Sequence, residues 1–169
     1  MKILSLFDGI SIAQQAFKEL GFEVEYYASE IDKNAIQITQ KNHPNTEQLG
    51  DVKEIDTSNG YLHYGKGKLA ETDIYFLIGG SPCQDLSIAK NKREGLNVKR
   101  SGLFWDYVRI LKDLKPKYFV LENVASMPKE AKNAITEALW GIEPIMIDAS
   151  LFSAQQRKRL FWIGQLSDK

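Results

Sequence analysis

Short apolar runs alternate along the chain with polar stretches, and the spacing of the apolar residues changes from one segment to the next. Apolar runs that end in polar or glycine turns predict strands over residues 2–7, 22–29, 47–52, 73–80, 117–124, 143–150 and 159–165. Apolar residues that recur at helical intervals predict helices over residues 12–20, 32–42, 101–114 and 128–140. Strands and helices therefore alternate with short connections.

The ends of the predicted helices carry residues that favour those positions. Gly21 follows the first helix as its stop, and Asp32 and Ser101 are expected N-caps of the second and third. Pro128 stands at the first turn of the last helix. Residues 57–68 are rich in glycine and polar side chains, which predicts a loop.

This order of elements predicts an α/β fold with a mostly parallel sheet. The last two strands have no helix between them and are expected to pair as an antiparallel hairpin at the sheet edge. In such folds ligands bind outside the carboxyl ends of the strands. Polar or reactive groups follow five of the predicted strands: Asp8 with Gly9, Glu30, Asp51, Ser81 to Cys83, and Glu122 with Asn123.

The first three strand ends suit a ligand that contains a nucleoside. The stretch "FDGIS" is a glycine turn into a helix start, although Ser11 stands where a full dinucleotide fingerprint has a second glycine. Glu30 follows that turn by about 20 residues, the spacing at which an acid binds ribose hydroxyls. Asp51 could accept from the exocyclic amine of adenine. Each acid alone could equally be a helix cap or a solvated residue, but the three together favour a nucleoside-bearing cofactor.

The single cysteine of the chain, Cys83, lies in the loop "GGSPCQDLS". It could be an inert loop residue, but a proline before it and basic residues after it favour the reactive thiolate. Glu122 ends the adjacent predicted strand and should lie across the sheet rim, where a carboxyl can deliver a proton. A cysteine and a glutamate beside a nucleoside pocket indicate a transferase that forms a covalent intermediate.

Composition narrows the class of protein further. The 169 residues are 43% apolar and 26% charged, as in soluble globular domains, and no run is long enough to span a membrane. One cysteine cannot form an internal disulfide, which favours an intracellular, reducing location, and zinc or another metal is not expected. Lys plus Arg and Asp plus Glu are both 22. A nucleic-acid partner is therefore suggested only by local basic runs, at residues 90–100 and 155–162.

Six motifs occur in a familiar order: "LFDGIS", "SEID", "GDV", "GGSPCQDLS", "ENV" and "QQRKR". With them, residues 3 to 164 resemble the cytosine carbon-5 DNA methyltransferase family, and "SLFDGI" and "PIMIDAS" are similar in wording to its animal de novo branch. The resemblance implies a Rossmann-like fold that binds S-adenosylmethionine and releases S-adenosylhomocysteine. It implies cofactor contacts by Phe7, Asp8, Gly9, Ile10, Ser11, Glu30, Ile31, Asp51, Val52, Ser81 and Leu103.

The resemblance also implies roles in catalysis. Cys83 would attack carbon 6 of a cytosine flipped out of duplex DNA, and Glu122 would hydrogen-bond or protonate ring nitrogen 3. Arg157 and Arg159 would lie near the cytosine oxygen and its phosphate. Asn123 would support the Pro-Cys loop. The basic run that follows this loop would correspond to the mobile catalytic loop of the family.

Family members continue beyond the paired arginines into a target-recognition domain and a C-terminal helix, whereas this chain stops at Lys169. The expectation is one catalytic domain, residues 1–169, without those parts. It could be one half of a split enzyme with a second chain, a compact form that self-assembles, or a catalytically silent regulatory relative. Methylation of cytosine in tRNA is an open alternative, because a tRNA-acting branch carries the same motifs.

Overall fold

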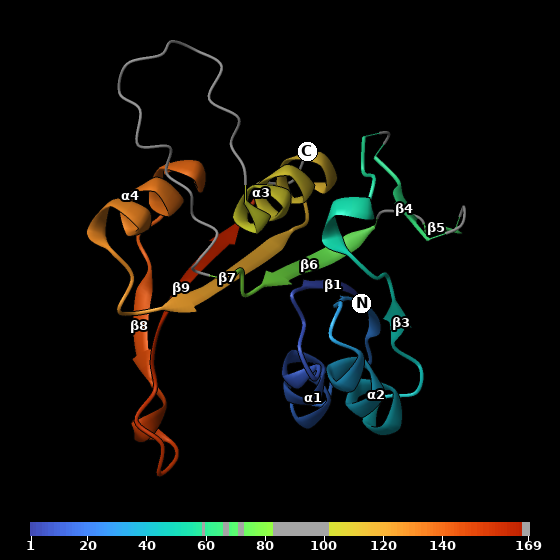
Figure 1. Ribbon diagram of the computed structural model, residues 1–169, viewed down its shortest axis with the longest axis horizontal. Helices are drawn as coiled ribbons and strands as arrows, with labels where there is room; N and C mark the ends of the chain where they lie inside the picture. The colour runs from blue at the N-terminus through green and yellow to red at the C-terminus, as the bar shows by residue number, and fades with distance from the viewer. Residues whose placement is uncertain (59, 66–67, 71–72, 83–101, 167–169) are drawn as a thin grey trace.

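The computed structural model describes residues 1–58, 60–65, 68–70, 73–82 and 102–166. Within them, a twisted seven-stranded sheet has the strand order β3-β2-β1-β6-β7-β9-β8 (Figure 1). Its strands are β1 (Lys2–Leu6), β2 (Glu25–Ser29), β3 (Glu47–Gln48), β6 (Ile74–Gly79), β7 (Tyr118–Val124), β8 (Ile145–Asp148) and β9 (Lys158–Gln165).

The strand order reverses at β1, which lies between β2 and β6 and is parallel to both. β2 is parallel to β3, and β6 is parallel to β7. The carboxyl ends of these five strands therefore meet at one edge of the sheet. In an open α/β sheet the crevice at such a reversal is where ligands bind.

The C-terminal part of the sheet is antiparallel. β9 pairs with β7 on one side and with β8 on the other, both in the antiparallel sense. The predicted α/β class, the mostly parallel sheet and the antiparallel C-terminal hairpin are therefore confirmed. In Figure 1 the β8–β9 hairpin extends away from the rest of the sheet.

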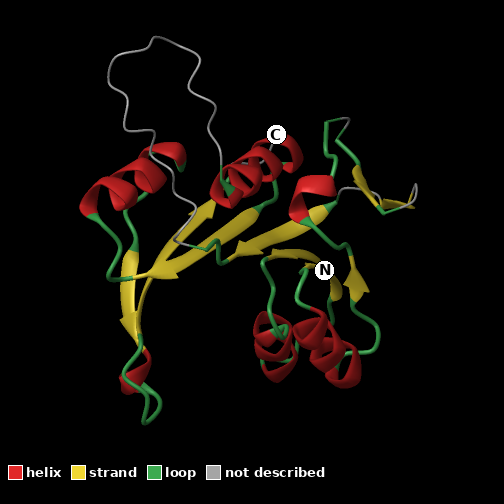
Figure 2. Cartoon of the chain, in the orientation of Figure 1, coloured by secondary structure: helices red, strands yellow, loops and turns green. Residues whose placement is uncertain are grey.

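Helices cover both faces of the sheet (Figure 2). α1 (Ile12–Glu19) and α2 (Lys33–Asn42) lie on one face, and α3 (Leu103–Leu114) and α4 (Lys129–Ala138) lie on the other. The larger hydrophobic core lies under α3 and α4, while a smaller cluster around Ile3, Tyr26 and Ala28 lies under α1. Both ligand-facing turns after β1 and β2 lead directly into helices.

Two helix starts differ in how well the sequence predicted them. The Asp32 side chain caps α2 as expected, accepting from the amides of Asn34 (2.7 Å) and Ala35 (3.1 Å). α3 begins at Leu103 with Gly102 at the N-cap position, at φ 131°. That conformation favours glycine, and the predicted cap, Ser101, lies outside the described residues.

The loop predicted over residues 57–68 is wrong in part. β4 (Leu62–Tyr64) and β5 (Lys68–Ala70) form a small antiparallel hairpin. Leu62 and Tyr64 are buried, and the Tyr64 ring meets the ring of Tyr27 on β2 with 6.5 Å between centroids. The alternation of apolar and polar residues over Leu62–Tyr64 favours a strand despite the neighbouring glycines, because Leu62 and Tyr64 pack into the hydrophobic core.

The third strand is shorter than predicted. It covers Glu47–Gln48, and a 3-10 helix, η1 (Val52–Glu54), takes up the end of the predicted segment. The Asp51 side chain caps η1 by accepting from the amide of Lys53 at 3.0 Å. A polar turn therefore replaces the last residues of the predicted strand.

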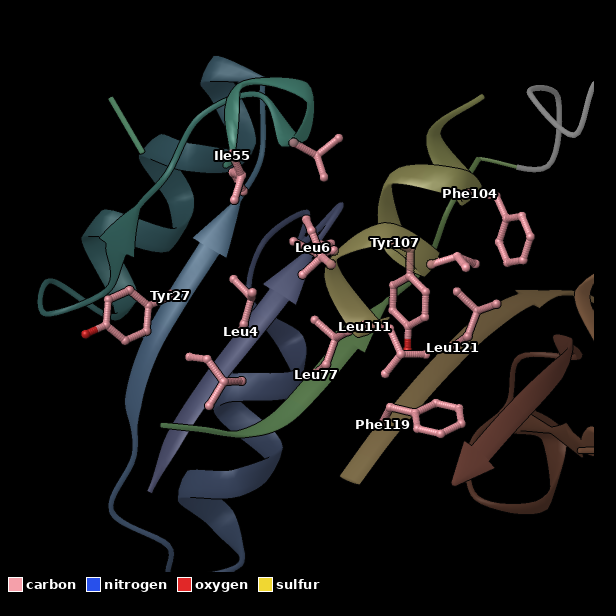
Figure 3. Packing of buried hydrophobic residues seen from close by; sticks show 14 of the residues in the cluster. Leu4, Leu6, Tyr27, Ile55, Leu77, Phe104, Tyr107, Leu111, Phe119 and Leu121 are labelled. Carbon is pink, nitrogen blue, oxygen red and sulfur yellow. The ribbon is translucent and has the colours of Figure 1, made fainter. Parts of the chain in front are cut away.

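Close packing joins α3 to the sheet. Figure 3 shows Tyr107 and Leu111 of α3 near Leu77 of β6 and Leu121 of β7. A Cβ atom on Gly79 would lie 2.6 Å from Tyr107 Cδ2, so the glycine makes room for this fully buried ring. Burial raises the pKa of the Tyr107 hydroxyl well above its ordinary value.

Candidate functional site

A cavity of about 280 Å³ lies at the carboxyl ends of the parallel strands. Its walls come from the segments that follow β1, β2, β3 and β6 and from the start of α3. The lining residues are Phe7, Ser29, Glu30, Ile31, Asp51, Val52, Gly80, Pro82 and Leu103. Segments far apart in the sequence therefore share one pocket at the place where the strand order reverses.

The cavity brings together about half of the residues predicted to contact a cofactor. Those that line it are Phe7, Glu30, Ile31, Asp51, Val52 and Leu103. Ser29, Gly80 and Pro82 also line it, although the sequence had not singled them out as contacts. The sequence could have indicated them, because Ser29 belongs to the "SEID" motif and Gly80 and Pro82 belong to "GGSPC".

Glu30 joins the two turns at the base of the cavity. Its Oε2 accepts from the amide of Gly9 at 2.7 Å, and its Oε1 accepts from the amides of Ile31 (2.8 Å) and Asp32 (2.9 Å). These three donors stabilise a negative charge at this point. The carboxylate therefore acts both as a local cap and as a fixed acidic group in the cavity wall.

The turn after β1 is held by buried polar contacts of its own. Asp8 accepts from the hydroxyl of Ser11 and, at 2.8 Å, from the hydroxyl of Tyr26. Ser11 is fully buried at φ 59°, and its Oγ lies 3.0 Å from Oγ1 of Thr39. Burial, with a smaller contribution from Asp8, raises the pKa of Tyr26 far above its ordinary value. These contacts fix the backbone of the turn beneath the cavity.

Five predicted cofactor contacts are not among the residues that line the cavity: Asp8, Gly9, Ile10, Ser11 and Ser81. Asp8 and Ser11 face buried partners, and the amide of Gly9 donates to Glu30. Ile10 is 41% exposed, and Ser81 is buried. Their direct contact with a cofactor stays a prediction.

Glu122 lies on β7 beside the loop that leads to Cys83. Its Oε1 is 2.7 Å from Nε of Arg159 on β9. Its Oε2 would be 3.3 Å from a Cβ atom placed on Gly80, so the carboxylate borders the lining of the cavity. Both side chains are partly exposed, at 31% for Glu122 and 21% for Arg159. This acidic group is therefore accessible and close to the pocket.

Asn123 fixes the same loop from inside the sheet. It is 2% exposed, and its Nδ2 donates to the carbonyl of Ser81 at 3.1 Å. Its Oδ1 accepts from the amide of Val124 at 2.8 Å. The amide side chain thus ties β7 to the backbone two residues before Cys83. Cys83 itself lies outside the described residues, so its position relative to Glu122 stays a prediction.

Arg157 precedes β9 and is exposed. Its backbone amide donates to Oδ1 of Asp148 at 3.0 Å. Asp148 also accepts from the amide of Ser150 at 3.1 Å and caps the 3-10 helix η3 (Ala149–Leu151). These donors, the Ser150 amide first, hold the pKa of Asp148 below its ordinary value. Asp148 therefore shapes the turn that carries Arg157, two residues before Arg159 on β9.

Metal-binding side chains do not cluster in the part of the chain that the structure describes. Among those residues, no group of three or more His, Cys, Asp or Glu side chains could hold a metal ion. None of the described helices has the length and apolar character needed to cross a bilayer.

A family model for C-5 cytosine-specific DNA methylases matches residues 1–169. The chain belongs to this family. Membership agrees with the order of the motifs and with the cavity, which residues of four of these motifs line: Phe7, Ser29 to Ile31, Asp51 with Val52, and Gly80 with Pro82. The predicted family is confirmed, while the finer similarity to an animal de novo branch stays a prediction.

Curated members of the methylase family are similar over nearly the whole chain. The orphan methyltransferase M.Rho11sI of Bacillus phage rho11s is 36% identical over 99% of this chain and 33% of its own length. The type II methyltransferase M.NgoPII of Neisseria gonorrhoeae is 35% identical over 99% of this chain and 49% of its own length. The chain therefore spans between a third and a half of these relatives.

A solved structure of the same type supports the fold. It is the crystal structure of a DNA modification methyltransferase encoded within a prophage of E. coli, which superposes with a TM-score of 0.69 at 26% sequence identity. The match covers 98% of this chain and 46% of that one. The arrangement of strands and helices described above is thus an arrangement found in a DNA methyltransferase.

Proposed function

We propose that this chain is the S-adenosylmethionine-binding, catalytic part of an enzyme that methylates carbon 5 of cytosine in DNA. One observation carries the proposal: the cavity beside the β1 turn shares Gly80 and Pro82 with the loop that Glu122 borders. A cofactor in the cavity and a base beside Glu122 would then be neighbours. Family membership of the whole chain supports the same chemistry.

The cavity has groups that fit each part of the proposed cofactor. A fixed carboxylate, Glu30, can accept from ribose hydroxyls, as acids at the end of the second strand do in related folds. Ile31 and Val52 offer apolar surface for the adenine ring, and Asp51 offers an acceptor for its exocyclic amine. When bound, S-adenosylmethionine supplies an activated methyl group on a positively charged sulfur.

The residues around the loop have different chemical roles toward the cytosine base. The Cys83 thiolate adds to carbon 6 of cytosine, and Glu122 donates a proton or hydrogen bond at ring nitrogen 3. Electron density then rises at carbon 5, which accepts the methyl group. Water then takes the proton from carbon 5, and the thiolate is expelled as the proton on ring nitrogen 3 returns to Glu122. These steps restore the double bond and the free cysteine. Arg159 holds the Glu122 carboxyl in place during these steps.

Asn123 has a supporting part in the proposed site. By holding the Ser81 carbonyl, it fixes the backbone from which Cys83 extends. Arg157 lies on the exposed turn before β9, where its charge can bind a DNA phosphate. An intracellular location, where the thiol stays reduced, is part of the same proposal.

Sequence recognition is proposed to come from outside residues 1–169. The chain spans a third to a half of its curated relatives, and its net charge is zero. We therefore expect the isolated chain to bind DNA weakly, with an affinity that falls steeply as salt rises. Further residues of the same protein, a second chain or a second copy would supply those contacts.

A methyl-transfer assay tests the proposed function. Labelled S-adenosylmethionine is incubated with mixed-sequence duplex DNA or with tRNA at several protein concentrations. The proposal predicts label at carbon 5 of cytosine in DNA, and a faster than linear rise with protein concentration if the chain self-assembles. Label in tRNA alone would reassign the substrate, and cofactor binding without transfer to either would indicate a regulatory relative.

A further inference from the structure

Arg109 lies on α3 and reaches the segment that forms one wall of the cavity. Its Nη1 donates to the carbonyl of Ile55 at 3.0 Å, and its Nη2 donates to the carbonyl of Val52 at 3.3 Å. Val52 is the first residue of η1 and lines the cavity. The first residue of α3, Leu103, lines the cavity as well. One side chain therefore links two walls of the same pocket.

The contacts of Arg109 are more than a surface ion pair. It does pair with Asp106 one turn earlier, at 3.3 Å, and such exposed pairs contribute little. The carbonyl contacts are different, because Ile55 is the C-cap of η1 and its carbonyl lies beyond the hydrogen bonds of that helix. The Val52 carbonyl accepts from the Ile55 amide at 3.3 Å and gains Arg109 as a second donor. Arg109 supplies donors to them from an element more than fifty residues away in the sequence. Its planar, forked guanidinium suits this geometry better than an ammonium group.

A second link joins the same two segments further from the cavity. Thr57 donates from Oγ1 to Oδ2 of Asp113, on the last turn of α3, at 2.6 Å. Neither residue is among those that line the cavity. Thr57 Oγ1 also accepts from Nη1 of Arg109 at 3.5 Å, so the matched control is made at Asp113. Asp113→Ala removes the link to Thr57 and leaves every contact of Arg109 in place.

We propose that Arg109 is a positioning residue that sets the selectivity of the cavity for adenine, an inference that rests on the proposed cofactor. Asp51 and Val52 would meet the edge and face of the base. Arg109 fixes the Val52 carbonyl, and the Asp51 side chain caps the same turn. If the turn moves, the Asp51 carboxylate loses its alignment with the exocyclic amine, and the preference for adenine falls.

The experiment measures binding by titration calorimetry, without turnover. The probes are S-adenosylhomocysteine and S-inosylhomocysteine, in which a ring carbonyl replaces the exocyclic amine. The proteins are the wild type, Arg109→Met, Arg109→Lys and the control Asp113→Ala. Thermal unfolding of each variant shows whether it is folded at the temperature of the titration.

The wild type is expected to bind S-adenosylhomocysteine in preference to the inosine analogue. Arg109→Met should lower the affinity for S-adenosylhomocysteine about tenfold. Two lost hydrogen bonds to carbonyls cost about 1 kcal/mol each, and part of that loss is expected to reach the cofactor site. It should also reduce the ratio between the two affinities. Arg109→Lys should restore part of that ratio. Asp113→Ala, which removes only the link to Thr57, should leave the ratio unchanged.

Other results would overturn the inference. An unchanged ratio in folded Arg109→Met, or an equal loss of ratio in Asp113→Ala, would show that Arg109 is only a structural link. If the wild type bound neither probe, the proposed cofactor site would fail first, and the inference with it. The wild-type titration therefore separates the two failures.

Discussion

The guanidinium of Arg159 binds the carboxylate of Glu122 across two antiparallel strands, with 2.7 Å between Nε and Oε1. In the register of β7 and β9, Glu122 lies opposite Phe161 and Arg159 lies opposite Val124. The pair is therefore diagonal and on one face of the sheet, within reach of long side chains. It directs the other carboxylate oxygen toward Gly80, and the catalytic role that we propose for Glu122 depends on this arrangement.

Replacing Glu122 by Gln should abolish most of the methyl transfer. The amide keeps the size of the side chain but cannot supply a proton to ring nitrogen 3, and such a group contributes about 10²–10⁴-fold to a rate. Methyl-transfer rates and S-adenosylhomocysteine affinity are measured together. The affinity should be unchanged.

The matched control is Glu143→Gln. Glu143 is 72% exposed and pairs with Lys132 at 3.2 Å on the surface, so its loss should leave the transfer rate within about twofold of the wild type. Equal rates for wild type and Glu122→Gln would remove Glu122 from the mechanism.

Gly79, the last residue of β6, and Gly80, which follows it, should respond differently to replacement by alanine. A Cβ on Gly79 would lie 2.6 Å from the buried Tyr107 ring, so Gly79→Ala should destabilise the fold by about 1–3 kcal/mol through overpacking. Among the residues that the structure describes, a Cβ on Gly80 would meet only the end of the Glu122 side chain, at 3.3 Å. Gly80→Ala should therefore fold almost normally but transfer methyl groups more slowly. Denaturant unfolding and transfer assays on both variants check this, and the reverse pattern would contradict it.

Glu30→Gln should weaken cofactor binding and loosen the turns that it joins. The NH₂ group of the glutamine would face a backbone N–H that now donates to the Glu30 carboxylate. Two donors would then face each other, at an expected cost in stability of about 1–3 kcal/mol. We expect at least about a tenfold loss of S-adenosylhomocysteine affinity by calorimetry, because 1.4 kcal/mol corresponds to a factor of ten.

Asp32→Ala is the neighbouring control for this prediction. Asp32 caps α2 and is not among the residues that line the cavity. Its loss should cost about 1 kcal/mol of stability with little change in affinity. If both variants lost affinity equally, the effect would come from the fold of the segment and not from the Glu30 carboxylate.

Asp148 should contribute to the dependence of stability on pH. Its pKa in the folded protein lies below the ordinary value of 3.8, mainly because the Ser150 amide donates to it. The contribution is therefore complete above that value and is lost as the pH falls through the folded pKa. Asp148→Asn keeps an acceptor but does not titrate.

Urea unfolding at several pH values from about 6 to about 3 tests this relation. The stability difference between wild type and Asp148→Asn should shrink toward the acid end of the series. A difference that stays constant across the series would show that the charge of Asp148 does not stabilise the turn before Arg157.

Periodicity was sufficient to predict the main fold, because each strand and helix buries a face that its own sequence displays. Five strand ends meet at one rim as expected, since parallel strands place their carboxyl ends together. The β4–β5 hairpin was missed because its short alternation, Leu62 to Tyr64, is stabilised by contact with Tyr27 far away in the sequence. Local glycine content was a misleading guide there.

The lining of the cavity was predictable where residues of a motif form it directly, as Glu30 and Asp51 do. It was less so where the partner comes from another element. Nothing near Asp8 in the sequence indicates that the Tyr26 hydroxyl donates a hydrogen bond to its carboxylate. Arg109 likewise resembles an ordinary surface arginine until η1 is placed against α3. Such contacts depend on tertiary structure and leave little signal in a single sequence.

Covalent trapping tests the central chemistry most directly. Duplex DNA that contains 5-fluorocytosine is incubated with the chain and S-adenosylmethionine, and the mixture is resolved under denaturing conditions. Fluorine at carbon 5 cannot leave as the proton does, so the account predicts a stable protein–DNA adduct that needs the cofactor and disappears in Cys83→Ser. No adduct at any protein concentration, or one that persists in Cys83→Ser, would contradict it.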